Sequence, residues 1–269
     1  MQTSEIAKQV KQLRTIFNLG GTRDLSWRKS QLEQLKRMLL THQQDFLAAL
    51  KADLNKAEHE AWSTEIGFVV RDIEHTIKHL KSWSKARTVK TPVFLQPGKS
   101  YLLPEPLGCV LIIGAWNYPL QLVLAPLVAA LAAGNCAIIK PSELAPNTAN
   151  LLATMVPRYM AHNACQVVTG GVAETTELLQ QKFDHIFYTG GERVGKIVMR
   201  AAADHLTPVT LELGGKCPCI VDNTANLPVS AARIVWSKWM NAGQTCVAPD
   251  YVIVEKSLLQ SLIDRKSVV

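Results

Sequence analysis

The sequence predicts an α/β protein in which N-terminal helices precede a parallel β-sheet. Two observations lead to this prediction. Apolar residues recur at helical spacing over roughly the first 85 positions. After residue 107, short runs of apolar and β-branched residues alternate with segments of helical pattern. This alternation is typical of βαβ units, which build parallel sheets. A chain of 269 residues is long enough to bury a large core, in one large domain or two medium ones.

Three amphipathic helices are expected first, over residues 6–17, 26–49 and 61–83. The segment that follows cannot be helical, because prolines interrupt it at positions 92, 97, 104 and 106. Its two apolar stretches, residues 93–95 and 101–103, flank a Gln-Pro-Gly-Lys turn and predict a β-hairpin.

Strands and helices should then alternate. We expect strands over residues 108–113, 136–139, 166–169, 185–189 and 209–213, and helices over residues 119–133, 147–162, 175–181 and 195–204. Gly134 is a typical C-cap of the first of these helices, and Asn147 should N-cap the second. A strand over residues 251–254 and a short helix over residues 258–263 follow.

The composition excludes several classes of protein. Charged and hydrophobic fractions of 19% and 48% are those of a globular chain rather than a disordered one. The net charge of +7 comes mainly from residues 1–105, which contain 17 Lys and Arg but only 11 Asp and Glu. Contact with nucleic acid is one interpretation of this excess. We favour solvated helix faces instead, and expect no nucleic-acid partner.

Membrane, secreted and metal-binding classes are also disfavoured. The sequence has no run of about 18 apolar residues that could span a membrane. Its N-terminus lacks the apolar core of a secretory signal. The six cysteines are scattered, which predicts reduced thiols in a cytoplasmic protein. Cys217-Pro218-Cys219 is too closely spaced for half of a zinc site, so no metal is expected.

Cys246 is the first candidate catalytic residue. It follows the glycine-containing turn Asn-Ala-Gly-Gln-Thr at the head of a new segment, a position that suits an exposed nucleophile. A small buried cysteine is the alternative interpretation. All seven histidines precede Cys246, which excludes the Cys-then-His order of papain-like enzymes.

Glu212 and Asn117 are candidates for the supporting roles. Glu212 lies at an apolar strand end before two glycines, where a charged carboxylate needs a partner or a raised pKa. It could act as a base, or form a structural ion pair with Lys216. Asn117 follows another predicted strand, where its amide could donate to a developing oxyanion. A simple turn residue before Pro119 is the alternative.

Two segments suit a nucleotide. Residues 190–196, Gly-Gly-Glu-Arg-Val-Gly-Lys, follow a predicted strand and open a helix, as a phosphate-binding turn does. Ile197 stands where a Walker A loop has Ser or Thr, and the spacing is not Gly-x-Gly-x-x-Gly, so an ordinary tight turn remains an alternative. Lys140 and Glu143 follow a second strand, and such a pair can bind the two hydroxyls of a ribose.

Together and in this order, these segments resemble the aldehyde dehydrogenase superfamily, most closely its class 3 branch. The resemblance covers essentially the whole chain and is most specific over residues 106–119, 134–143, 183–196, 207–216 and 241–250. It implies a Rossmann-like NAD(P)-binding domain, with the helices and an oligomerisation hairpin, over residues 1–210. It also implies the start of a second α/β catalytic domain over residues 211–269. The implied reaction is NAD(P)-dependent oxidation of an aldehyde to a carboxylic acid through a cysteine thiohemiacetal and thioester, in a homodimer.

The resemblance also implies a role for each candidate. Cys246 would be the nucleophile, Glu212 the general base and Asn117 an oxyanion donor. Lys140 and Glu143 would bind the adenine ribose of NAD or NADP, and the turn over residues 190–195 would approach the pyrophosphate. The expected cofactor-binding residues are Ile113, Gly114, Trp116, Lys140, Ser142, Glu143, Gly190, Gly191, Gly195 and Leu213.

Two features depart from the family pattern. Gly191 occupies a position where many members have a serine that bonds the pyrophosphate. The chain is also much shorter than most members, so we expect a fragment with weak activity or none. A non-catalytic nucleotide-binding fragment, or a cysteine-dependent thioester or ester hydrolase, is the alternative function.

Overall fold

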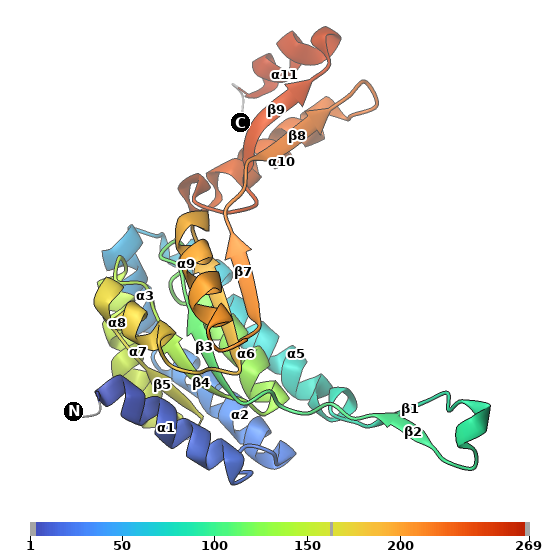
Figure 1. The fold of residues 1–269 in the computed structure, drawn as a ribbon. Coiled ribbons are helices and arrows are strands. Elements are labelled where there is room, and N and C mark those ends of the chain that lie inside the picture. The colour runs from blue at the N-terminus through green and yellow to red at the C-terminus, as the bar shows by residue number, and fades with distance from the viewer. Residues whose placement is uncertain (1–3, 162–163, 267–269) are drawn as a thin grey trace. The chain divides into compact units, whose positions relative to one another are not determined.

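The computed structural model describes residues 4–161 and 164–266 (Figure 1). The chain divides into two compact units. Residues up to Thr189 together with Arg193–Glu212 form the first unit, and Gly190–Glu192 together with the residues from Leu213 onward form the second. Within the described ranges, no helix is both long enough and apolar enough to cross a membrane.

The first unit begins with helices, as predicted, but their boundaries differ. They are α1 (Glu5–Asn18), α2 (Leu25–Thr41), α3 (Gln43–Leu54), α4 (Glu58–Ala61) and α5 (Gly67–Trp83). The single helix predicted over residues 26–49 is wrong, because His42 leaves the helical conformation between α2 and α3. The imidazole of His42 bonds Asp45 and Tyr159 at this break, at 2.9 and 3.0 Å. A π-helical turn, Trp62–Ile66, connects α4 to α5.

The hairpin is present with a different first strand. β1 (Arg87–Val89) pairs antiparallel with β2 (Ser100–Leu102). Residues Val93–Leu95, predicted to be a strand, form a 3-10 turn within the connection. Thr91 closes this connection, because its Oγ1 accepts a hydrogen bond of 2.9 Å from the Ser100 amide. The apolar run 93–95 therefore marked an exposed turn and not a strand.

The predicted parallel sheet is confirmed. Its five strands are β3 (Cys109–Ile113), β4 (Cys136–Lys140), β5 (Cys165–Val167), β6 (His185–Gly190) and β7 (Val209–Leu213), in the order β5-β4-β3-β6-β7. β3 pairs in parallel with both β4 and β6. The chain thus moves outward from β3 on one side and returns to build the other side, which is Rossmann-like topology.

Four helices connect these strands: α6 (Gln121–Ala133), α7 (Pro146–Tyr159), α8 (Val172–Leu179) and α9 (Glu192–Ala203). Gly134 is the left-handed C-cap of α6, as predicted. Asn147 is not the N-cap of α7, because Pro146 already begins the helix and Ala145 precedes it. The predicted end of this helix at His162 lies outside the described residues, and the helix ends at Tyr159.

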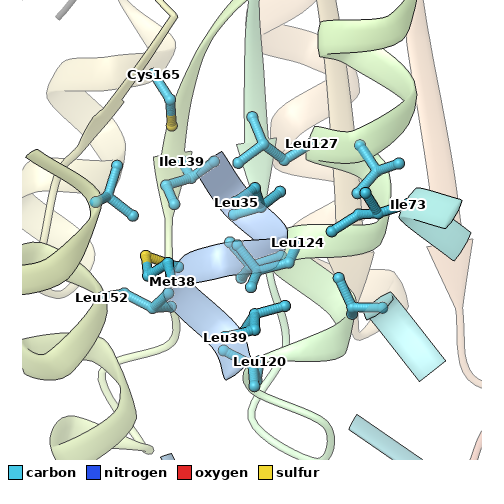
Figure 2. Close-up of a cluster of buried hydrophobic side chains, with 14 of the residues drawn as sticks. Leu35, Met38, Leu39, Ile73, Leu120, Leu124, Leu127, Ile139, Leu152 and Cys165 are labelled. Atoms are coloured by element: carbon cyan, nitrogen blue, oxygen red, sulfur yellow. The ribbon is translucent and has the colours of Figure 1, made fainter. Parts of the chain in front are cut away.

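A large apolar core joins the helices to one face of the sheet (Figure 2). Leu35, Met38 and Leu39 of α2 lie at its centre and are fully buried. Side chains from α5, α6, β4 and α7 surround them: Ile73, Leu124, Leu127, Ile139 and Leu152. Each buried leucine or isoleucine contributes about 1.5–3 kcal/mol to folding, so this core supports the strand ends that carry the candidate site.

The second unit is a smaller α/β assembly. β8 (Cys217–Val221) pairs in parallel with β9 (Pro249–Val254). They are accompanied by α10 (Leu227–Trp239) and α11 (Leu259–Lys266). β9 and α11 correspond to predicted elements, whereas β8 and α10 were not predicted. Among the described residues of this unit, Val221, Ala231 and Leu262 form a small buried cluster.

Candidate functional site

The carboxyl ends of β3, β4 and β6 lie at one edge of the sheet in the first unit. Ile113, the last residue of β3, is in register with Lys140 of β4 and Tyr188 of β6. The Gly114 amide donates a hydrogen bond of 3.1 Å to the Lys140 carbonyl. The strand order reverses at β3, because β4 and β5 lie on one side of it and β6 and β7 on the other, and ligands of open α/β sheets bind at such a point.

Gly114 is required by packing. A Cβ atom added at this position would lie 2.2 Å from Val123 Cγ2 of α6, closer than any contact between carbon atoms allows. Glycine at this position lets α6 approach the end of β3. The predicted cofactor residues Ile113 and Gly114 are both buried here.

Lys140 and Glu143 form a polar pair at the end of β4. Lys140 Nζ donates to Glu143 Oε2 at 2.8 Å; the lysine is 2% exposed and the Glu143 side chain 48%. Partial burial would raise the pKa of Glu143, but the hydrogen bond from Lys140 and its positive charge hold that pKa below its ordinary value. Ser142 Oγ accepts from the Leu144 amide at 3.3 Å and shapes the turn. The arrangement presents a charged carboxylate that can accept hydrogen bonds from hydroxyl groups.

The turn from β6 to α9 supplies a further polar group. β6 ends at Gly190 and α9 begins at Glu192, with Gly195 buried inside the helix. Just before the turn, the hydroxyl oxygen of Thr189 is buried and has no hydrogen-bond partner among the described residues. A buried polar group without a partner is costly, so this strand end fits a polar ligand. Thr189 was not among the predicted site residues, although a threonine near the end of an apolar strand and before two glycines is a usable signal.

Asn117 lies in the loop between β3 and α6. Its side chain is half-buried, and Trp116 beside it is 38% exposed. The Asn117 carbonyl accepts a hydrogen bond of 3.1 Å from Lys56 Nζ. Lys56, which lies just after α3, and its buried partner Glu65, in the π-helical turn, are more than fifty positions away in the sequence. Neither residue was predicted to belong to the site, although Glu65 interrupts an apolar helical pattern in the sequence.

Glu212 is exposed near the end of β7, and Leu213 ends the strand half-buried. The expectation that burial makes this carboxylate costly is therefore wrong, because Glu212 is exposed. Lys216, the alternative partner considered for Glu212, belongs to the second unit. There its Nζ lies 3.2 Å from Asp250 Oδ2.

Cys246 follows a strained loop in the second unit. Asn241, Ala242 and Gly243 have consecutive positive φ angles of 52°, 54° and 77°. The left-handed conformation costs a non-glycine residue roughly 1–2 kcal/mol, and such strain concentrates at functional sites. Gln244 holds the loop, because its backbone and side-chain N–H groups both donate to the Asn241 carbonyl at 3.0 Å.

The six cysteines differ sharply in accessibility. Cys109, Cys136 and Cys165 are buried, Cys217 and Cys219 are half-buried, and Cys246 is exposed. Burial raises the pKa of the Cys165 thiol far above its ordinary value, which keeps it protonated. The Cys217 thiol donates to the Cys246 carbonyl at 3.2 Å. Of the six thiols, that of Cys246 belongs to the most exposed class.

Comparison with known proteins matches residues 1–267 to the aldehyde dehydrogenase family. A dimeric NADP-preferring aldehyde dehydrogenase of Canis lupus familiaris is 49% identical over 262 residues, covering 97% of this chain and 58% of the relative. Aldehyde dehydrogenase family 3 member A2 of Rattus norvegicus is 51% identical over 258 residues, covering 96% of this chain and 53% of the relative.

The chain also resembles solved structures of aldehyde dehydrogenases. The substrate-bound state of Staphylococcus aureus AldH superposes with a TM-score of 0.96 at 47% identity, covering 99% of this chain and 58% of that one. A lactaldehyde dehydrogenase superposes with a TM-score of 0.88 at 26% identity. The chain therefore spans a little more than half the length of the relatives that it matches.

Proposed function

This chain belongs to the aldehyde dehydrogenase family, and on that premise we propose that the whole protein oxidises an aldehyde to a carboxylic acid with NAD or NADP. The observation that carries the proposal is the family match over residues 1–267, which include every candidate site residue. The name of the rat relative, which assigns it to family 3, supports the class 3 branch. One aldehyde and one water give one acid and one released proton, while two electrons and a further proton pass to the nicotinamide as a hydride.

In this proposal Cys246 is the nucleophile. Its thiolate sulfur bonds to the aldehyde carbon, and the carbonyl oxygen becomes an oxyanion. The Asn117 amide and the Cys246 backbone N–H donate hydrogen bonds to that oxyanion. Loss of a hydride from the same carbon leaves a thioester on the cysteine. Glu212 then takes a proton from water, whose oxygen displaces the sulfur and releases the acid. The exposure of Cys246 and the burial of three other cysteines support this assignment.

The dinucleotide, when bound, supplies the hydride acceptor. Lys140 and Glu143 would bind the adenine ribose, and backbone N–H groups of the turn at Gly190 and Gly191 would bind the pyrophosphate. The buried hydroxyl of Thr189, without a partner in the described part of the chain, supports a polar ligand at this strand edge. Glu143 favours the free 2′-hydroxyl of NAD, whereas the Lys140 ammonium can bind the 2′-phosphate of NADP.

A homodimer is part of the proposal. The word dimeric belongs to the name of the canine relative. In this chain Val93 and Phe94, in the connection between β1 and β2, are 85% and 84% exposed. An apolar surface on a second copy would remove these side chains from water. A cytoplasmic location also remains a prediction.

The test is aldehyde-dependent formation of reduced cofactor by the whole protein. Cys246→Ala should abolish this activity while leaving cofactor affinity within about twofold, because the cysteine bonds the substrate and other residues bind the dinucleotide. Residual turnover above about 1% of the parent would exclude Cys246 as the nucleophile, since an essential nucleophile accounts for many kcal/mol of the barrier. Cleavage of activated esters with no reduction of NAD or NADP would favour the hydrolase alternative.

A further inference from the structure

We propose that the buried ion pair of Lys56 and Glu65 is a positioning device for the Asn117 loop. The pair touches the loop on both sides of Pro119: Lys56 holds the backbone at Asn117, and Glu65 holds the backbone at Leu120 and Gln121. The inference rests on the proposed function only for the role of Asn117 as an oxyanion donor. The contacts that carry it lie entirely within the first unit.

Glu65 acts as the N-terminal cap of α6. The first N–H groups of a helix have no partner within the helix, and Leu120 at the N-cap has no side chain that could accept them. Glu65 Oε2 accepts hydrogen bonds from the Leu120 and Gln121 amides at 2.9 and 3.1 Å. A carboxylate here also interacts favourably with the helix dipole. The π-helical turn that carries Glu65 places the side chain inward, where it is fully buried.

Lys56 connects this cap to Asn117. It lies just beyond the C-terminus of α3, where Asn55 adopts a left-handed conformation, and it is 4% exposed. Its ammonium donates to Glu65 Oε1 and, at 3.1 Å, to the Asn117 carbonyl. It also lies over the Tyr118 ring, 4.1 Å from the ring centre. The lysine therefore contacts two consecutive residues of the loop, and one of them is the proposed oxyanion donor.

The cost of burying this pair argues for a role beyond folding. Burial lowers the pKa of Lys56 and raises the pKa of Glu65, because it disfavours the charged form of each side chain. The opposite charge of the partner and the hydrogen bonds of the pair oppose this effect. Apolar side chains of similar size often stabilise a protein as well as a buried ion pair does. Apolar side chains, however, cannot form hydrogen bonds that hold the Asn117 carbonyl and the Leu120 and Gln121 amides in place.

The main variant replaces the pair with apolar side chains of similar size, Lys56→Met with Glu65→Leu. The matched control is Lys36→Met with Glu74→Leu, which removes a partly exposed ion pair of 2.5 Å between α2 and α5. In the whole protein we expect the main variant to lower aldehyde oxidation about 10- to 100-fold, because a displacement of about 1 Å at a reacting centre costs up to that factor. Cofactor affinity should stay within about twofold of the parent, and the control should keep parental activity.

A double-mutant cycle with Asn117→Ala separates positioning from a general structural effect. If the pair acts through Asn117, removing it from the Asn117→Ala background should cause little additional loss. Losses that multiply in that background, or a folded main variant with activity within twofold of the parent, would overturn the inference. Should the main variant not fold, Glu65→Asp replaces it. This variant keeps both charges but shortens the reach, and it should lose several-fold activity in the parent background alone; parental activity would overturn the inference.

Hydrogen exchange at the Leu120 and Gln121 amides tests the device without an activity assay. The main variant or Glu65→Asp should exchange these two amides at least tenfold faster than the control. Unchanged exchange would reject the positioning role even if the protein oxidises aldehydes. Conversely, a parent that reduces no cofactor with any aldehyde would reject the proposed function, while faster exchange would still support the role of the pair in holding the loop.

Discussion

Gly191 is a residue at which this chain departs from the family pattern. The resemblance implies that many members have a serine at this position. A Cβ added to Gly191 would meet no heavy atom within 4 Å among the described residues, so packing does not require glycine. Its amide belongs to the turn before α9, the segment assigned to the pyrophosphate. In the proposed site the turn therefore contacts the pyrophosphate through its backbone alone, and a serine hydroxyl at this position could add one more hydrogen bond to it.

Gly191→Ser should tighten NAD or NADP binding about two- to tenfold, because one added hydrogen bond contributes roughly 0.5–1.5 kcal/mol. Gly191→Ala is the matched control and should bind the cofactor as the parent does, since it adds bulk without a donor. Calorimetry or cofactor fluorescence measures both affinities. Equal affinities of the serine and alanine variants would show that the turn does not approach the pyrophosphate.

Glu212→Gln should separate the two halves of the proposed reaction. An amide cannot take a proton from water, so the first turnover should still produce a burst of reduced cofactor while steady-state turnover collapses. Because Glu212 is exposed, the substitution should leave the melting temperature unchanged. A burst and a steady state that fall by the same factor would place Glu212 earlier, in generating the thiolate.

At the scale of elements, Asp53 shows how one helix is tied to another. Asp53 belongs to α3, yet its carboxylate accepts four hydrogen bonds from the start of α7. The Asn147 and Thr148 amides donate at 3.0 and 2.8 Å, and their side chains donate at 2.8 and 2.7 Å. This contact replaces the N-cap that Ala145 cannot supply.

Asp53→Ala should therefore destabilise the protein by about 1–2 kcal/mol, the usual loss for a removed cap. Asp53→Asn keeps one acceptor oxygen and should lose about half as much. Denaturant unfolding monitored by circular dichroism measures both. A loss below about 0.3 kcal/mol for the alanine variant would mean that water satisfies these helix ends equally well.

Elements with a strong local pattern were predictable from the sequence, and elements that depend on distant partners were not. The buried strands β3 and β4 and the C-cap at Gly134 follow from apolar runs and from one glycine. The break at His42 depends on Tyr159, and the N-terminus of α7 depends on Asp53. The first hairpin strand has only three residues and is largely exposed, so its sequence carries little apolar signal.

The candidate site shows the same division. Cys246 and the Lys140–Glu143 pair follow a turn and a strand that the sequence reveals, and Glu212 lies near the end of a predicted strand. The structure places Lys140 and Glu143 in direct contact. Lys56, Glu65 and Thr189 were missed because their importance lies in contacts with residues far along the chain, or in a hydroxyl without a partner in the described residues. A lysine beyond a helix end is ordinarily a solvated surface residue.

At the scale of the whole molecule, the two units differ in the size of their cores. The first has a core of about thirty buried residues that includes three strands and several helices, and the second has Val221, Ala231 and Leu262. Opening free energies within one protein range from near zero to the global value, and they follow the density of buried apolar contacts. The two units should therefore open independently and with different free energies.

Hydrogen exchange of this 269-residue chain should resolve that difference. Amides of β3 and β4, which are fully buried and lie at the centre of their sheet, should exchange slowest. Amides of β8 and β9, which form a two-stranded sheet with partly exposed side chains, should exchange at least about 100-fold faster. That factor corresponds to about 2.7 kcal/mol in opening free energy. Equal protection of the two pairs of strands would show instead that the units unfold as one cooperative body, and that the small core is stabilised as strongly as the large one.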